Sequence, residues 1–302
     1  MPYHTLFGLH KEPFSTSPDP DFFYLTKEHE TALTNVLIEL RLKRGLSLIF
    51  GDVGTGKTTL SRKLVQELKR RNDMIFHIIL NPSFSGETQL LLSLIRNFNI
   101  DLRTCVGATG VFDPSLPDVM DLRDAIEKFL IQKVVDEKRT VILIVDEAQK
   151  VDQATLEVLR ILLNFETNEY KLLQLVLLGQ LELYPKVSGM ANFFDRISFR
   201  YTLNPLGLNE TRELIHFRLL KAGCREPAKI FLEESIQEIY NYSRGYPRQI
   251  TMLCHQLLKE LVIQDKQLID RLLVHQVIIK QQQAGYGRFE AYRELSRQKV
   301  LV

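Results

Sequence analysis

The 302-residue sequence has few cysteines and little net charge, and each shortage excludes a class of protein. Its three cysteines, Cys105, Cys224 and Cys254, are far apart and lack metal-ligand spacing, so the sequence predicts neither a disulfide framework nor a zinc site. The formal net charge is only +2, which gives no dominant field for binding nucleic acid or a membrane. A local basic patch is still compatible with this balance.

Long hydrophobic runs are also missing. No stretch approaches the roughly 18 apolar residues that a membrane-spanning helix requires. The opening residues, "PYHTLFGLHKEPF", lack the apolar core of a secretory signal. We therefore expect a soluble, cytoplasmic protein, and the 45% hydrophobic content is enough for one large core or two domains.

Over the first two thirds of the chain, apolar runs of strand length alternate with segments whose apolar residues recur at helical spacing. The runs are "LSLIF" (46–50), "MIFHIIL" (74–80), "VILIV" (141–145), "LLQLVLL" (172–178) and "SFRYTL" (198–203). We interpret the first three as strands buried in a parallel sheet. Between the strands, helices are expected at 57–71, after 85, around 122–130, at 153–167 and from about Leu181, with a loop at 99–119.

After Pro205, the apolar residues recur only at helical spacing. A helix beginning near Asn209 has a weak capping box, because Arg212 stands where glutamate is usual. Another helix is predicted by an apolar stripe at helical spacing, made of Ile250, Leu253, Cys254, Leu257, Leu258 and Leu261. We expect a small helical domain at 205–283 and a tail at 284–302.

The stretch "GDVGTGKTTL" (51–60) fits the phosphate-loop pattern and lies between a predicted strand and a predicted helix. Glycines let successive backbone N–H groups point inward, and the helix that follows adds the positive end of its dipole. Lys57 would reach the β- and γ-phosphates, and the Thr58 hydroxyl would bind Mg²⁺. The expected nucleotide-binding residues are Gly51, Asp52, Val53, Gly54, Thr55, Gly56, Lys57, Thr58 and Thr59.

Two carboxylates follow the most apolar strand, in "VILIVDEAQ". Asp146 is placed to hold Mg²⁺, and Glu147 is placed to polarise an attacking water molecule. An acidic pair after a strand is also common at a helix start, but together with the phosphate loop it indicates hydrolysis of the nucleotide. Gln180, after the next apolar strand, would lie beside the γ-phosphate, the alternative being an amide that faces solvent.

The chain resembles AAA+ ATPases of the ExeA (general secretion pathway protein A) type from about residue 3 to residue 283. The resemblance rests on "FGLHKEPF", "SPDPDFFYLTKEHETAL", "GDVGTGKTTLSRKL", "DEAQKV", "LEVLRILLNFET", "KLLQLVLLGQLEL" and "GYPRQITMLC". It implies a three-layer α/β/α domain with a parallel sheet in the order 5-1-4-3-2, followed by a helical lid. The implied domains are 1–204, which includes an N-terminal segment that covers adenine, and 205–283.

The resemblance also assigns roles to single residues. It implies a sensor-1 role for Gln180, a sensor-2 role for Arg248 and an arginine finger before the fifth strand. Arg196 is the preferred finger and Arg200 the alternative, and each arginine could instead be a surface charge. His29 would contact the base or ribose, with a capping or surface role as the alternative.

An arginine finger acts across a subunit interface, so the resemblance implies a homo-oligomer, either a ring, hexameric by expectation, or a filament. ATP and Mg²⁺ are the expected cofactors. The favoured function is ATP-driven assembly or remodelling of a secretion, pilus or other envelope machine through a protein client, with the protein cytoplasmic or peripheral at the inner membrane. The alternative is a DNA-associated regulator similar to transposition ATPases.

Overall fold

The computed structural model describes residues 8–15, 22–102 and 118–283. Contacts divide the chain into two compact units. The sheet unit consists of Lys27–Asp52 and Leu60–Leu203. The helical unit consists of Val53–Thr59 with the described parts of Met1–Thr26 and Asn204–Val302. Among the described residues, no helix is both long enough and apolar enough to span a membrane.

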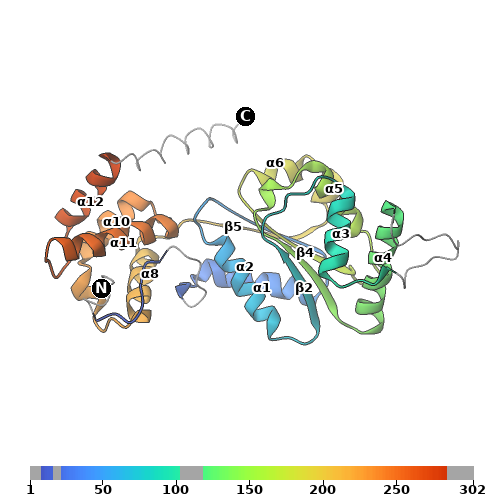
Figure 1. Cartoon of the computed structure of the whole chain (residues 1–302), viewed down its shortest axis with the longest axis horizontal. Coiled ribbons are helices and arrows are strands. Elements are labelled where there is room, and N and C mark those ends of the chain that lie inside the picture. The colour runs from blue at the N-terminus through green and yellow to red at the C-terminus, as the bar shows by residue number, and fades with distance from the viewer. Residues whose placement is uncertain (1–7, 16–21, 103–117, 284–302) are drawn as a thin grey trace. The chain divides into compact units, whose positions relative to one another are not determined.

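The sheet unit is built on five parallel strands in the order β2-β3-β4-β1-β5 (Figure 1). This is the expected order 5-1-4-3-2, read from the other edge of the sheet. Because the strands are parallel, the carboxyl ends of all five lie at the same end of the sheet, which is where ligands bind in open α/β sheets. This end is called the edge of the sheet below, and β2 and β5 are called its outer strands. The strands are β1 (Leu46–Gly51), β2 (Met74–Ile79), β3 (Thr140–Val145), β4 (Leu173–Gly179) and β5 (Ile197–Leu203).

Burial along the strands follows their place in the sheet. Every residue of β1, β3 and β4 is buried, as expected for central strands covered on both faces. The strand predicted at "MIFHIIL" is present, but the expectation that it is buried is wrong for its middle residues, because β2 is an outer strand of the sheet and only its two end residues are buried. Its His77 is half-buried beside Phe98, with ring centroids 6.1 Å apart, and burial lowers the pKa of this imidazole.

Helices cover both faces of the sheet (Figure 1). On one face, α1 (Lys27–Arg41) and α2 (Lys57–Lys69) share a core with Ile49, Ile142 and Val176. On the other face lie α3 (Glu87–Asn97), α4 (Val119–Ile131) and α5 (Gln153–Leu162). Alternate residues of the central strands β1, β3 and β4 contribute to the two cores, because successive side chains of a strand point to opposite faces of the sheet.

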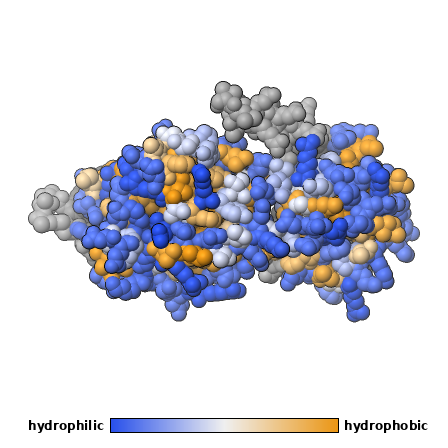
Figure 2. All heavy atoms as spheres, turned by 180° about the vertical axis from the view of Figure 1, so that it is seen from behind, coloured by the Kyte–Doolittle hydropathy of each residue, from blue (hydrophilic) through white to orange (hydrophobic). Residues whose placement is uncertain are grey.

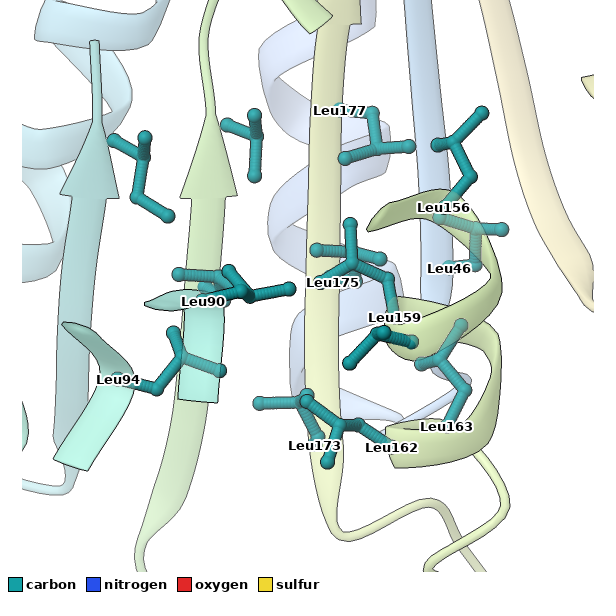
Figure 3. Packing of buried hydrophobic residues seen from close by; sticks show 14 of the residues in the cluster. Leu46, Leu90, Leu94, Leu156, Leu159, Leu162, Leu163, Leu173, Leu175 and Leu177 are labelled. Carbon is teal, nitrogen blue, oxygen red and sulfur yellow. The ribbon is translucent and has the colours of Figure 1, made fainter. Parts of the chain in front are cut away.

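The second core is rich in leucine. Figure 3 shows Leu90 and Leu94 of α3, with Leu156 and Leu159 of α5, packed against the face of the sheet that carries Leu173, Leu175 and Leu177 of β4. Burying one such side chain contributes about 1.5–3 kcal/mol. Helix packing therefore holds β4 firmly, together with the residues at its carboxyl end.

Irregular elements complete the sheet unit. A π-helical turn, Gln132–Asp136 (η4), leads into β3, and a 3₁₀ turn, Ala148–Lys150 (η5), follows it. Two short helices, α6 (Leu183–Ser188) and α7 (Ala191–Phe194), precede β5.

The predicted helix at 153–167 extends too far, because α5 ends at Leu162. Glu166 and Lys171 then form an antiparallel bridge, and the turn between them is closed by the Thr167 N–H, which donates to the Tyr170 carbonyl at 2.9 Å. The chain thus leaves the helix after Leu162 and reverses direction between Glu166 and Lys171, where the expected helix would have ended.

The helical unit contains α8 (Leu208–Lys221), α9 (Pro227–Ile230), α10 (Glu233–Ser243), α11 (Pro247–Ile263) and α12 (Arg271–Gln283). The apolar stripe predicted from Ile250 to Leu261 is buried along α11. The expected cap at Asn209 is wrong, because α8 begins after Gly207, whose N–H donates to Glu210 Oε2 at 3.0 Å. The glutamate that the sequence pattern lacked therefore lies two residues earlier than Arg212.

Residues 8–15 and 22–26 pack within the helical unit, whereas the expected domain limits of 1–204 and 205–283 placed them with the sheet. Leu9, Phe14 and Phe22 are buried in its core, and the Phe14 ring meets Phe231 edge-on at 5.9 Å. The His10 N–H donates to the Ala222 carbonyl at 2.7 Å. These aromatic and aliphatic side chains enlarge a core that would be small for the C-terminal helices alone.

Two expectations lie outside the described residues, namely most of the loop at 99–119 and the tail at 284–302. On the face that Figure 2 shows, the described residues are largely hydrophilic, and apolar residues form small separate patches. Of the cysteines in the described part, Cys224 is half-buried and Cys254 is buried, and burial raises the pKa of the Cys254 thiol.

Candidate functional site

The loop between β1 and α2 has the backbone that the phosphate-loop pattern predicts. β1 ends at Gly51, α2 begins at Lys57, and the intervening Gly54 and Gly56 have φ angles of +84° and +99°. L-residues rarely adopt such angles, so glycine is needed at both positions. The loop thus turns the chain from the sheet into the N-terminus of a 13-residue helix, where an anion is stabilised by the helix dipole.

The side chains of this loop differ in burial. Lys57 is buried, with 6% of its surface exposed, and Thr55 is fully buried. Thr58, Thr59 and Asp52 are half-buried, while Val53 is exposed. A buried ammonium group is stable only beside hydrogen-bond acceptors or negative charge.

Asp146 follows β3 directly and is buried, with 1% of its surface exposed. Its Oδ2 accepts a hydrogen bond from the Ser61 hydroxyl at 3.2 Å, and its Oδ1 accepts one from the Glu147 N–H at 2.9 Å. Ser61 lies in the second turn of α2, so this bond fixes the carboxylate of β3 against the helix that follows the phosphate loop. A buried carboxylate such as that of Asp146 is a type of ligand that suits Mg²⁺.

Glu147 adopts the left-handed backbone conformation, with φ 56° and ψ 35°. For a residue other than glycine this costs on the order of 1 kcal/mol, and such strain persists where neighbouring contacts impose it. Two side chains hold its carboxylate. Gln149 Nε2 donates to Glu147 Oε2 at 2.8 Å, and Lys150 Nζ lies 3.7 Å from the same oxygen.

These two side chains connect Glu147 with the strands on either side of β3. Lys150 Nζ donates to Asn81 Oδ1 at 3.2 Å, just beyond the end of β2. Gln149 Oε1 accepts the Gln180 N–H at 3.0 Å, directly after the end of β4. The half-buried Glu147 is therefore held from both sides, with polar groups at the carboxyl ends of three adjacent strands.

Sequence reasoning missed Gln149, Lys150, Asn81 and Ser61. The first two are visible in "DEAQK", two and three positions after Glu147, where a tight turn can bring a polar side chain back to the carboxylate. No local signal marks Asn81 or Ser61, because their partners lie 69 and 85 residues away in the chain.

Gln180 lies at the same edge of the sheet as Asp146, because β4 is next to β3. Its backbone joins the network through Gln149, and its side chain is half-buried. Gly51 ends β1 on the other side of β4. The structure thus brings the end of the phosphate-loop strand, Asp146, Glu147 and Gln180 to one edge of the sheet.

The two candidate fingers have different surroundings. Arg196 precedes β5, and its guanidinium donates to Asn164 Oδ1 and to the Asn192 carbonyl. Arg200 lies within β5, is exposed, and stacks over the Phe194 ring with its guanidinium carbon 5.7 Å from the ring centroid. Neither residue lies at the edge of the sheet where Asp146 is found, because β5 begins at Ile197.

Arg248 and His29 are in different units. Arg248 is exposed in the first turn of α11, and its N–H donates to the Gly54 carbonyl at 3.4 Å within the helical unit. A Cβ on Gly54 would lie 3.0 Å from the Arg248 Cβ, so the absence of a side chain at Gly54 permits this approach. His29 is buried in α1 of the sheet unit.

Comparison with known proteins agrees with this geometry. Residues 40–187 match the family model described as AAA domain. The chain is 37% identical over 258 residues to general secretion pathway protein A of Aeromonas hydrophila, an alignment that covers 85% of this chain and 44% of that protein. The chain thus spans less than half the length of this relative.

Solved structures support the fold. The Aeropyrum pernix ORC2 protein, in its ADPNP-ADP complexes, aligns with a TM-score of 0.60 at 17% identity, covering 90% of this chain and 72% of that chain. Cdc6p from Pyrobaculum aerophilum gives a TM-score of 0.59 at 16% identity, covering 85% and 67%. The RuvB Holliday junction branch migration motor of Thermotoga maritima gives 0.52 at 16% identity, covering 82% and 68%. The chain thus carries an AAA domain at residues 40–187 and is similar to general secretion pathway protein A over 258 residues.

Proposed function

We propose that the protein is an AAA+ ATPase that couples hydrolysis of Mg-ATP to the assembly or remodelling of a protein machine. The observation that carries this proposal is the grouping of Asp146, Glu147 and Gln180 at the sheet edge where β1 enters the phosphate loop. Glu147 favours hydrolysis over simple binding, because a protein that only holds nucleotide needs no water-activating carboxylate.

Each residue has a stated task in this proposal. Backbone N–H groups of the loop and the Lys57 ammonium bind the phosphates, and Thr58 with Asp146 would hold the metal. Mg²⁺, when bound, would neutralise charge on the phosphate oxygens. Glu147 orients and polarises the attacking water, and Gln180 stabilises the γ-phosphate.

Binding of the nucleotide itself has further contributors. Arg248, which meets the phosphate loop through its backbone, contributes a positive charge to the bound nucleotide. His29 completes the proposed contacts, at the base or ribose.

We further propose that the active form is a homo-oligomer, a ring or a filament, in which an arginine of one subunit completes the site of the next. Arg196 is the preferred finger and Arg200 the alternative. A finger supplied in trans contributes about 10³- to 10⁵-fold in rate to phosphoryl transfer. A monomer would therefore hydrolyse ATP slowly, and turnover per subunit would rise with protein concentration.

The client is proposed from the relative. General secretion pathway protein A is named for secretion, and a machine of the cell envelope is the corresponding client for this chain. Positions in the cytoplasm, free or held at the inner membrane by a partner, are compatible with that role.

The test combines two variants, because each removes a different half of the composite site. Glu147→Gln should bind ATP but lose about 10²- to 10⁴-fold in turnover, the usual contribution of a general base. Arg196→Ala should also be slow. A mixture of the two should exceed the sum of the separate activities, because a Glu147→Gln subunit still supplies its arginine to an intact neighbouring site.

Glu169→Gln is the matched control, since this carboxylate is exposed in the turn before β4, and it should retain full activity. Wild-type turnover in Glu147→Gln would refute the role of Glu147. If only mixtures with Arg200→Ala recover activity, the finger is Arg200.

A further inference from the structure

We propose that Gln149 is a positioning residue that holds the Glu147 carboxylate in its working orientation and ties that orientation to the end of β4. The inference rests on the proposed function, since it concerns the same water-activating group. Its basis is a single amide side chain with both ends engaged: Nε2 donates to Glu147 Oε2 at 2.8 Å, and Oε1 accepts the Gln180 N–H at 3.0 Å.

The local backbone explains how a side chain two residues away reaches Glu147. The left-handed conformation at Glu147 reverses the chain, and the 3₁₀ turn Ala148–Lys150 follows at once. The buried Ala148 anchors this turn in the core, with none of its surface exposed. Glu147 and Gln149 therefore lie on the same side of the turn, and the strained backbone serves to bring them together.

The backbone of Gln149 is itself fixed from two directions. A Cβ on Gly179 would lie 3.3 Å from the Gln149 nitrogen, so the end of β4 packs closely against the turn. From α6, Lys186 Nζ donates to the carbonyls of Gln149 and Val151 at 2.6 and 3.0 Å. With the main chain held, the direction of the Gln149 side chain is set by its two hydrogen bonds.

Lys150 provides the second contact to Glu147, but of a different kind. Its ammonium lies 3.7 Å from the carboxylate, is exposed, and donates to Asn81. A flexible exposed ammonium acts as a point charge and sets direction weakly, whereas a planar amide at 2.8 Å defines the position of the carboxylate oxygen. Gln149 is thus the residue that orients Glu147.

A consequence is that Glu147 and Gln180 cannot move independently. Gln180 occupies the proposed sensor position, where the γ-phosphate would be detected. Any shift of the chain after β4 on binding or loss of that phosphate would be passed to Glu147 through one side chain. In this way the residue that activates water would respond to the presence of the group that is to be attacked.

The experiment measures kcat and KM for ATP in the 302-residue protein with substitutions at Gln149. Gln149→Ala should lower kcat about 10- to 100-fold, because a misplacement of about 1 Å at a reacting group can cost 10²-fold. KM should stay within about twofold, since the phosphate-binding residues are untouched. Gln149→Asn should behave like Gln149→Ala, because the shorter side chain cannot reach both partners.

Gln149→Glu separates orientation from simple filling of space. It keeps the length of the side chain and the acceptor for the Gln180 N–H. It lacks the donor, however, and places a second carboxylate against Glu147. Its kcat should fall at least as far as that of Gln149→Ala. Gln153→Ala, in the same sequence neighbourhood but exposed at the start of α5, is the matched control and should keep wild-type kcat.

A double-mutant cycle with Glu147→Gln tests whether Gln149 acts through Glu147. If it does, adding Gln149→Ala to Glu147→Gln should change kcat by less than about twofold, because the group to be oriented is already lost. A further loss as large as in the wild-type background would overturn the proposal. Unchanged kcat in Gln149→Ala, with only a lower melting temperature, would show that the residue merely stabilises the turn and would overturn it too.

These outcomes are distinct from failure of the proposed function. Absence of ATP hydrolysis in the wild-type protein, at concentrations where it is assembled, would refute the ATPase itself and Gln149's role with it. Hydrolysis by the wild type and its loss in Glu147→Gln, with full activity in Gln149→Ala, would refute the positioning role alone.

Discussion

Replacing Gly245 by alanine should destabilise the helical unit and weaken nucleotide binding. Gly245 has a φ of +77°, and an alanine Cβ there would lie 1.9 Å from the Leu206 carbonyl oxygen. The left-handed backbone alone costs about 1–2 kcal/mol for alanine. Forcing apart a packed contact of this kind costs about 1–3 kcal/mol more. Together these two effects should lower the free energy of unfolding of the helical unit by about 2–5 kcal/mol.

The overlap between the new Cβ and the Leu206 carbonyl oxygen should also weaken a nearby hydrogen bond. The Leu206 N–H donates to the Gly245 carbonyl at 2.8 Å, so relief of the clash would lengthen the bond that joins the chain entering α8 to the chain entering α11. α11 starts two residues later, at Pro247, and carries Arg248 in its first turn. The substitution should therefore displace Arg248 from the loop glycine Gly54 that its backbone contacts.

Thermal unfolding and titration with a fluorescent ATP analogue would measure the two effects. A loss of 1 kcal/mol lowers the melting temperature of a domain of 60–100 residues by about 4–8 °C, so a drop of 10 °C or more is expected. Gly207→Ala is the control, because its φ is −73° and its Cβ would meet only Glu210 Oε2, at 3.9 Å. Equal melting temperatures for Gly245→Ala and Gly207→Ala would refute the reasoning.

Two further predictions concern the metal site and pH. Ser61→Ala removes the hydroxyl that donates a hydrogen bond to the buried Asp146. Because hydrogen bonds to charged groups contribute about 1.5–3 kcal/mol, the affinity for ATP in the presence of Mg²⁺ should fall about tenfold or more. In the same titration without Mg²⁺, the affinity for ATP should change little. The free energy of unfolding should decline as pH falls below about 6.5. Burial lowers the pKa of His77, His216 and His255 in the folded chain. Below about pH 6.5 the unfolded chain therefore binds protons that the folded chain does not, and this favours unfolding. Urea unfolding at pH 7.5 and 5.5 measures this, and the difference should shrink in His216→Gln; an unchanged or rising stability at pH 5.5 would contradict it.

The sequence alone was sufficient to predict those elements that are specified by residues adjacent in the chain. Apolar runs of strand length predicted each of the five strands within one or two residues. In β1, β3 and β4 the run is continuous because these strands are buried on both faces. The phosphate loop was equally visible, since its glycines, lysine and threonine are adjacent in the chain. Asp146 and Glu147 were found for the same reason, at the end of the most apolar strand.

Sequence patterns failed where neighbours in space make the difference. β2 is as apolar as a central strand, yet its middle residues are partly exposed because β2 is an outer strand of the sheet that the described residues form. α5 stops early because a bridge between Glu166 and Lys171 competes with the helix. The N-terminal segment joins the helical unit because Phe14 and Phe22 fill its core, which no periodicity in the segment itself could indicate.

Only the tertiary structure revealed the network around Glu147. Its members come from the ends of β2, β3 and β4, and the pairing of strands distant in sequence brings Asn81, Gln149 and Gln180 to one edge. A hydrogen bond such as that from Ser61 to Asp146 spans 85 residues of chain, and its existence depends on the register of a sheet and the packing of a helix. Residue types fixed by a local pattern can be read from sequence, whereas partners chosen by long-range packing become visible only in the fold.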